Sequence, residues 1–105
     1  MATPPQRLVH TMYYVIGHIT VKDPAQWAEY RAQVPATLAP WQAELVFRGE
    51  RHAVLGGCHT HTDTVVIRFP SAEAVDGWFH SAAYQALIPL RLAAADVDLI
   101  SYAAS

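Results

Sequence analysis

The sequence has few of the features that mark secreted, membrane or nucleic-acid-binding proteins. Its 105 residues include a single cysteine, Cys58, so an internal disulfide is excluded and a Cys-rich zinc site has no support. Seven Lys and Arg residues stand against nine Asp and Glu residues, and the basic ones are scattered along the chain. They form no stripe that could neutralise a phosphate backbone. No apolar run approaches the length of a membrane span. We therefore predict a protein with no nucleic-acid partner and no membrane partner.

Several well-known catalytic and targeting signatures are also missing. The first seven residues, Met1 to Arg7, lack the apolar stretch and the small-residue cleavage site of a signal peptide, so we predict a cytoplasmic location. There is no Gly-x-Gly-x-x-Gly or phosphate loop, no Gly-x-Ser-x-Gly elbow and no His-Glu-x-x-His. The sequence therefore implies no cofactor.

What the chain does have is enough apolar sequence to build a core, with 52% apolar and 15% charged residues. Runs rich in β-branched and aromatic residues predict four strands. Between them lie two segments with apolar residues at helical spacing. The expected strands cover residues 12–21, 43–50, 64–69 and 97–102, and a connection covers residues 51–62.

Both expected helices begin at recognisable caps. Asp23 followed by Pro24 is a strong helix start, because Asp accepts an unpaired amide and Pro lacks one. Trp27 and Leu38 belong to the buried face of this helix, and Pro35 predicts a kink or a break, with a short turn to about residue 39. Ser71 caps the second helix, and Ser81 caps a further turn that ends before Pro89.

The predicted order β-α-β-β-α-β is an α+β fold of the ferredoxin-like type, with two helices on one face of a four-stranded antiparallel sheet. Residues 1–10 contain Pro4-Pro5 and little periodicity, and we expect a flexible N-terminal segment there. Residues 11–105 are expected to form a single domain.

The expected strands are apolar on both faces, which two helices cannot cover. In the first strand, Val15 and Ile19 alternate with Tyr14, Ile16 and His18. A solvent-facing sheet normally has one polar side. We therefore expect a homodimer in which two sheets pack together with a cavity between them. The alternative is a monomer with an amphipathic outer face.

Two residues are candidates for catalysis. His18 lies within a strand, where an imidazole inside a cavity could act as a general acid or base. Its other interpretation is a hydrogen-bonded histidine of the core or interface. Arg48 could hold a carboxylate or enolate oxygen. Alternatively, it forms a salt bridge with an acid such as Glu44 or Asp98.

Further residues could contact a ligand or a metal. The aromatic side chains that could wall an aromatic substrate are Tyr14, Tyr30, Trp41, Trp78 and Tyr84. In an extended chain, His59, His61 and Asp63 would project to one side and could bind zinc, iron or copper. No fourth ligand is indicated, however, and a His-x-His in a solvated turn is the simpler interpretation, so no metal is assigned.

The segments Tyr14 to Pro24, Arg48-Gly49, Val65 to Ser71 and Trp78 to Arg91 resemble the domain of unknown function 1330 family, over about residues 12–103. This resemblance implies the dimeric α/β-barrel superfamily, whose members include monooxygenases, cyclases, isomerases and haem-degrading enzymes. It also implies a cavity between sheet and helices. Two segments depart from the family pattern: Trp41-Gln42-Ala43 replaces a usual Gly-Gly, and residues 58–63 lack the usual Trp and Arg.

Together these features predict a small-molecule-binding dimer. We expect either a cofactor-independent acid–base enzyme of the isomerase, cyclase or monooxygenase type, acting on an oxygenated or aromatic metabolite, or a non-catalytic ligand-binding or stress-associated dimer. A third hypothesis is a metal or haem protein that uses His18, His59 or His61.

Overall fold

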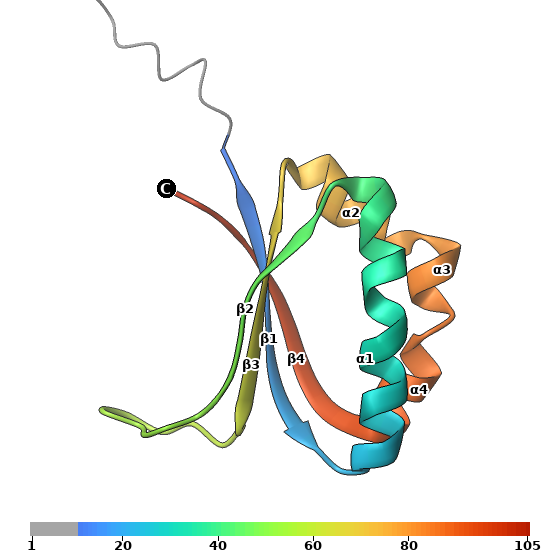
Figure 1. The fold of residues 1–105 in the computed structure, drawn as a ribbon. Coiled ribbons are helices and arrows are strands. Elements are labelled where there is room, and N and C mark those ends of the chain that lie inside the picture. The colour runs from blue at the N-terminus through green and yellow to red at the C-terminus, as the bar shows by residue number, and fades with distance from the viewer. Residues whose placement is uncertain (1–10) are drawn as a thin grey trace, which may run out of the picture.

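The molecule has two layers, a twisted antiparallel sheet and a set of helices packed on one of its faces (Figure 1). The computed structural model describes residues 11–105. The strands are β1 (Tyr13–Val21), β2 (Glu44–Glu50), β3 (Asp63–Phe69) and β4 (Ala95–Ala103), in the order β2-β3-β1-β4. The helices are α1 (Pro24–Leu38), α2 (Ala72–His80), α3 (Ala82–Gln85) and α4 (Ile88–Ala94), with a 3₁₀ turn, η2 (Ala39–Trp41).

This arrangement confirms the predicted α+β, ferredoxin-like fold. The two halves of the chain interleave, because β1 pairs with β3 on one side and with β4 on the other. The predicted flexible segment, residues 1–10, lies outside the described residues.

The first helix starts as predicted but does not break. The Asp23 carboxylate accepts hydrogen bonds from the backbone N–H groups of Ala25 and Gln26, and Pro24 occupies the first turn. The helix then continues past Pro35 to Leu38, with η2 after it. Proline removes one helical hydrogen bond, but the buried residues Thr37 and Leu38 follow it, and their packing holds the last turn in place.

The turn into β2 carries a residue in the left-handed conformation. Gln42 has φ 56°, a conformation that glycine adopts without steric cost. It lies in the segment where the family pattern has Gly-Gly. Trp41 packs over Gly77 of α2, so closely that a Cβ at position 77 would be 2.3 Å from the Trp41 ring. Trp41 therefore fastens η2 to α2.

The second half of the chain has one more helix than predicted. Ser71 and Ser81 cap α2 and α3, each accepting a hydrogen bond from a backbone N–H three residues later. The turn predicted to end before Pro89 is instead followed by α4, in which Pro89 lies in the first turn. Proline is favourable there because the first amides of a helix have no helical partner. β4 then begins at Ala95, two residues before the predicted start at Val97.

The core lies between the helices and the covered face of the sheet. Val15 and Ile19 of β1 and Ile67 and Phe69 of β3 point to this side, and each is at most 4% exposed. Trp78 of α2 packs on Phe69, with ring centroids 5.4 Å apart. Burial of side chains of this size contributes about 1.5–3 kcal/mol each to folding, so this layer supplies most of the stability of the chain.

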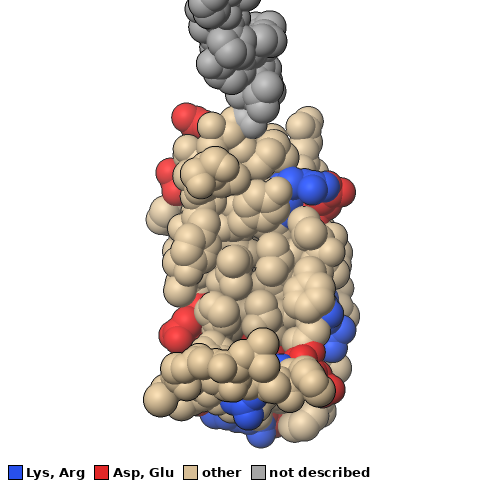
Figure 2. All heavy atoms as spheres, turned by 90° about the vertical axis from the view of Figure 1, so that its left-hand side faces the viewer, with Lys and Arg blue, Asp and Glu red and all other residues tan. Residues whose placement is uncertain are grey.

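The other face of the sheet has no helices over it. We call it the uncovered face; it carries Tyr14, Ile16, His18, Thr20, Phe47, Val66, Ile100 and Tyr102. Figure 2 shows this face with its charged side chains gathered near the edge. Phe47 is 54% exposed. Among residues 11–105, no helix is both long enough and apolar enough to cross a membrane.

Candidate functional site

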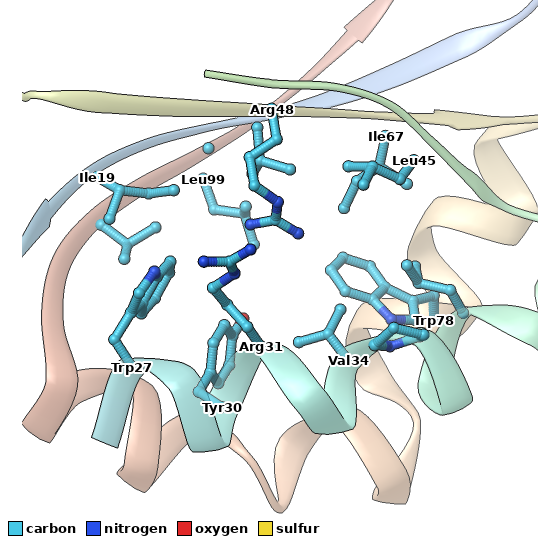
Figure 3. Close-up of a pocket in the computed structure, with 15 residues that line it drawn as sticks. Ile19, Trp27, Tyr30, Arg31, Val34, Leu45, Arg48, Ile67, Trp78 and Leu99 are labelled. Carbon is cyan, nitrogen blue, oxygen red and sulfur yellow. The ribbon is translucent and has the colours of Figure 1, made fainter. Parts of the chain in front are cut away.

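A pocket lies between α1 and the covered face of the sheet (Figure 3). Its volume is about 60 Å³. Most of the residues around it are apolar, and α1 and the four strands all contribute. They are Gly17, Ile19, Trp27, Tyr30, Arg31, Val34, Pro35, Leu38, Leu45, Arg48, Val65, Ile67, Trp78, Val97 and Leu99.

The shape of the pocket depends on aromatic walls and on one missing side chain. Trp27 and Tyr30 stack with ring centroids 5.1 Å apart, and the Trp78 indole closes the opposite end (Figure 3). On the sheet, a Cβ at Gly17 would be 2.9 Å from a Val65 methyl group, closer than carbon atoms normally approach. Glycine therefore keeps the floor of the pocket open.

Two arginines define the polar part of the pocket. Arg31 of α1 and Arg48 of β2 extend toward each other across it (Figure 3). The ion pairs found within residues 11–105 join other residues, and no acidic side chain lines the pocket. Partial burial lowers the pKa of Arg48, and the neighbouring Arg31 charge lowers it further. Both side chains are exposed to solvent, and arginine side chains are cationic in proteins. The pocket therefore holds two positive charges with no counter-ion among residues 11–105.

The alternative role considered for Arg48, a salt bridge, has no support from the positions of its candidate partners. Glu44 pairs with Arg68 on the uncovered face. Asp98 pairs with His61, with 2.9 Å between Nε2 and Oδ2. Both carboxylates are thus engaged on the side of the sheet away from Arg48.

The arginines also border a hollow on the outer side of the pocket. Arg31 and Arg48, with Ala28 and Ala32, line a space of about 280 Å³. The guanidinium groups therefore lie between an apolar interior and a larger opening toward solvent. A molecule with an apolar part and an anionic group would fit here, with its apolar part toward the interior and its anionic group beside the two arginines.

Behind the pocket wall, two tyrosines and an arginine form a buried hydrogen-bonded chain. The Tyr30 and Tyr84 hydroxyls are 2.8 Å apart, and Arg91 donates to the Tyr84 hydroxyl at 2.8 Å. Burial, with the neighbouring Tyr84, strongly raises the pKa of Tyr30. Tyr30 therefore faces the pocket as a neutral phenol and cannot neutralise the arginines.

His18 lies on the other side of the sheet from Arg48. Its ring is on the uncovered face, 5.1 Å from the His59 ring and 6.4 Å from the His61 ring, measured between centroids. Its Nδ1 atom is buried without a hydrogen-bond partner among the described residues. His18 and Arg48, the two predicted catalytic residues, therefore do not meet in one cavity of a single chain.

The three side chains considered as metal ligands, His59, His61 and Asp63, do not form a metal site within residues 11–105. His61 uses both ring nitrogens, one with Thr20 Oγ1 at 2.9 Å and one with Asp98 Oδ2. Asp63 is the first residue of β3, where it pairs with Ile19 and Glu50. Within residues 11–105, no three His, Cys, Asp or Glu side chains converge in a way that could hold a metal ion.

The four predicted substrate-binding aromatic residues lie in four different settings. Trp78 lines the pocket, and its indole N–H donates to Thr37 Oγ1 at 3.0 Å. Tyr84 lies behind Tyr30, and Trp41 packs on α2 away from the pocket. Tyr14 is on the uncovered face, opposite Arg68 and Tyr102 in the neighbouring strands.

The sequence analysis missed Arg31. The signal that could have revealed it is its spacing, because Arg31 lies four residues after Trp27 and seven before Leu38, on the same helix face. A cation on an otherwise apolar helix face, with no acid at a neighbouring turn of that face, is unusual and indicates a site.

Solved structures of similar fold share little sequence with this chain. The RPA0582 protein of unknown function from Rhodopseudomonas palustris has a TM-score of 0.78 and 15% identity, covering 96% of this chain and 89% of its own. SnoaB, a cofactor-independent oxygenase from Streptomyces nogalater, has a TM-score of 0.64 and 14% identity, covering 90% and 94%. A dimeric ferredoxin-like protein of unknown function from Thermobifida fusca has a TM-score of 0.65 and 13% identity, covering 91% and 93%.

These similarities support the fold alone, because sequence identities this low do not indicate that two proteins share an activity. No protein with a curated description matches this chain. The sequence model of one family, described as domain of unknown function (DUF1330), matches residues 12–103, nearly the whole of the described chain. This match confirms the resemblance seen in the sequence, and the chain belongs to the DUF1330 family.

Proposed function

We propose that this protein binds a small organic anion in the pocket between α1 and the sheet. The observation that carries the proposal is the pair of guanidinium groups, Arg31 and Arg48, beside an apolar cavity with no carboxylate. The two like charges repel each other, and an anion between them would relieve that repulsion. The ligand would supply that anion and place its apolar part among the aromatic walls.

A second candidate function is cofactor-independent oxygenation of such a ligand. The guanidinium pair is suited to hold an enolate or phenolate, the electron-rich form that reacts with dioxygen. SnoaB, which has a similar fold, is described as a cofactor-independent oxygenase. The pocket residues include no His, Asp, Glu, Lys or Cys, so the chain would contribute electrostatic stabilisation there rather than a base. His18 stays a predicted acid–base group, but its ligand would lie on the uncovered face.

The binding proposal is tested by calorimetry with matched ligands. Benzoate and benzamide have nearly the same shape, but only benzoate is charged. We expect saturable binding of benzoate, or of a larger aromatic carboxylate in a panel, and no binding of the matching amide. Arg48→Gln should weaken binding about tenfold or more, because a charge-assisted pair is lost. Lys22→Gln removes a positive charge outside the pocket and should leave binding unchanged.

Two results would overturn this proposal. One is equal binding of acid and amide, and the other is equal binding by the Arg48→Gln and Lys22→Gln proteins. Oxygenation is tested separately, by oxygen consumption with aromatic hydroxy compounds. Saturable binding without oxygen uptake or product would favour the non-catalytic alternative.

We also propose that the working form is a homodimer joined through the uncovered faces of two sheets. Three observations support it: large apolar side chains such as Phe47 of β2 and Ile100 of β4 are exposed on this face, its charges lie near the edge (Figure 2), and similar folds include proteins described as dimeric. Exposed apolar surface of this extent is typical of an interface.

Light scattering after gel filtration tests the dimer with a matched pair of variants. Phe47→Asp places a charge on the uncovered face and should convert the protein to single chains. Leu92→Asp places the same charge on α4, at a residue that is 59% exposed, and should leave the dimer intact. A dimer that survives Phe47→Asp, or one that Leu92→Asp dissociates, would contradict this interface.

A further inference from the structure

The two arginines of the pocket would affect the protonation state of a ligand as well as its binding. This inference rests on the proposed function, since it concerns the same site. Arg31 and Arg48 approach from two different elements, so an atom between them would be close to both charges (Figure 3). The side chains on the inner side are largely apolar and both arginines are exposed on the outer side, so charge–charge interactions there are stronger than in bulk water and weaker than in a buried site. Such a site favours the ionised form of any acidic group that enters it.

We propose that the pocket takes weakly acidic phenols or enols and binds them as their oxyanions, so that binding itself removes the proton. A ligand that is mostly neutral in solution at neutral pH would become an anion between Arg31 and Arg48. The inner pocket of about 60 Å³ is smaller than a cavity that encloses a benzene ring. The ring would therefore lie with one edge toward Trp27, Tyr30 and Trp78 and with the rest in the outer hollow of about 280 Å³.

A delocalised oxyanion suits this pocket better than a carboxylate does. A carboxylate concentrates its charge on two strongly hydrated oxygens, and stripping that water is costly in an apolar cavity. A phenolate or enolate spreads its charge over the conjugated system, so less hydration is lost. Arginine is itself weakly hydrated and stacks on flat conjugated groups. The flat walls formed by the stacked Trp27 and Tyr30 rings are also suited to a planar ligand.

The proton has a defined route out of the pocket. The O–H bond of the ligand breaks, its electron pair stays on oxygen, and the proton passes to water. No lining residue could keep it, because Tyr30 is a neutral phenol and the arginines are already protonated. The hollow bordered by Ala28, Ala32 and the two arginines connects this point to solvent. One proton is therefore released to the buffer for each ligand bound.

The like charge of Arg31 beside Arg48 supports the same conclusion. Burial and the charge of Arg31 both oppose the charged form of Arg48 in the empty pocket. An oxyanion between them would relieve both effects, so the two arginines and the ligand oxygen stabilise one another's charges. By linkage, the site binds the anion more tightly than the neutral parent molecule.

The experiment uses 4-nitrophenol, whose oxyanion is yellow while the neutral form is not. The full-length protein is titrated into 4-nitrophenol at a pH about one unit below its midpoint in water, and the phenolate band is followed. We expect the yellow band to grow to saturation, equivalent to a midpoint lowered by about one pH unit or more. Lys22→Gln should give the same shift. Arg48→Gln should lose most of it, and Arg48→Lys, which keeps one charge but loses the planar fork, should be intermediate.

Circular dichroism of each variant shows whether it is folded, and the Lys variant supplies the test if the Gln variant is not. The inference is overturned if calorimetry shows that 4-nitrophenol binds and its colour does not change, or if Arg48→Gln gives the full shift. If aromatic carboxylates bind in an Arg48-dependent way but 4-nitrophenol does not bind or shows no shift, the proposed anion site stands and this inference fails. If neither class binds, both fail.

Discussion

The two faces of the sheet differ in whether their basic side chains have acidic neighbours. Around the uncovered face, basic side chains have acidic neighbours: Arg68 pairs with Glu44, and His61 hydrogen-bonds Asp98. On the covered face, Arg31 and Arg48 share an apolar pocket that contains no acid. Surface pairs of the first kind contribute little to stability. Like charges held side by side without an acid repel each other, and proteins tend to keep such features where a ligand needs them. The proposed ligand site therefore lies on the covered face, and the proposed contact between copies lies on the uncovered one.

Two phenylalanines provide the largest test of this comparison. Phe69 lies on the covered face and is fully buried, whereas Phe47 lies on the uncovered face and is 54% exposed. Phe69→Ala should lower the free energy of unfolding by about 3–5 kcal/mol, because it leaves a cavity beside Trp78. Phe47→Ala should change it by about 0.5 kcal/mol in single chains. Urea unfolding, at a concentration where gel filtration shows single chains, measures both.

Protein concentration supplies the control for this pair. The proposed dimer would stabilise the folded chain by mass action, so the cost of Phe47→Ala should grow with protein concentration while that of Phe69→Ala stays constant. Equal costs for the two substitutions in single chains would mean that the uncovered face is already packed within one copy.

Two tyrosines give a smaller contrast. Tyr84 is buried and shares hydrogen bonds with Tyr30 and Arg91, whereas Tyr102 on the uncovered face is 46% exposed. Tyr84→Phe should lower the free energy of unfolding by about 1–3 kcal/mol, because two buried polar groups lose their partner. Tyr102→Phe should change it by less than about 0.5 kcal/mol. Thermal unfolding of the two variants, under the same buffer conditions, measures the difference.

A double variant shows whether the Tyr84 effect comes from the hydroxyl chain. Replacing both Tyr30 and Tyr84 by Phe removes both members of one hydrogen bond, so the combined cost should be smaller than the sum of the two single costs. Additive costs would place the effect in packing instead of in the hydrogen bond between the two hydroxyls.

The sequence was informative about the fold because the relevant signals are local. The Asp23 cap, the Ser71 cap and the strand alternation each depend on residues close together in the chain, and the structure confirms them. Pro35 and Pro89 were the exceptions. A proline signals a break or a start depending on what packs around it, and that packing comes from residues far away in the sequence.

The site was less predictable, because it depends on which face of the sheet each residue occupies. Arg48 was identified as a cavity cation, and the structure does place it in a pocket. Its strand contains a bulge between Leu45 and Phe47, which shifts the alternation by one residue. The alternation within one strand also cannot show that His18 and Arg48, on different strands, lie on opposite faces. Only the packing of α1 on the assembled sheet brings Arg31 and Arg48 together.

The smallest expected changes in the free energy of unfolding come from replacing Arg48 on the covered face and Arg68 on the uncovered face. The two changes are expected to have opposite signs. Arg48→Gln should raise the free energy of unfolding by a few tenths of a kcal/mol, because it removes one of two like charges that lack a counter-ion. Arg68→Gln should lower it by about 0.2–1 kcal/mol, because it breaks the pair with Glu44, whose side chain is 59% exposed. Chemical unfolding in low salt, without ligand, measures both changes.

Added salt separates these charge effects from changes in packing. Both effects should shrink toward zero in concentrated salt, since exposed charges are screened within a few ångströms there. A loss of stability in Arg48→Gln as large as that in Arg68→Gln would mean that Arg48 already has a counter-ion within the protein, and it would remove the main reason for placing a ligand between the two arginines. A gain in stability together with a loss of benzoate binding would show that the chain gives up stability at this position in order to bind an anion.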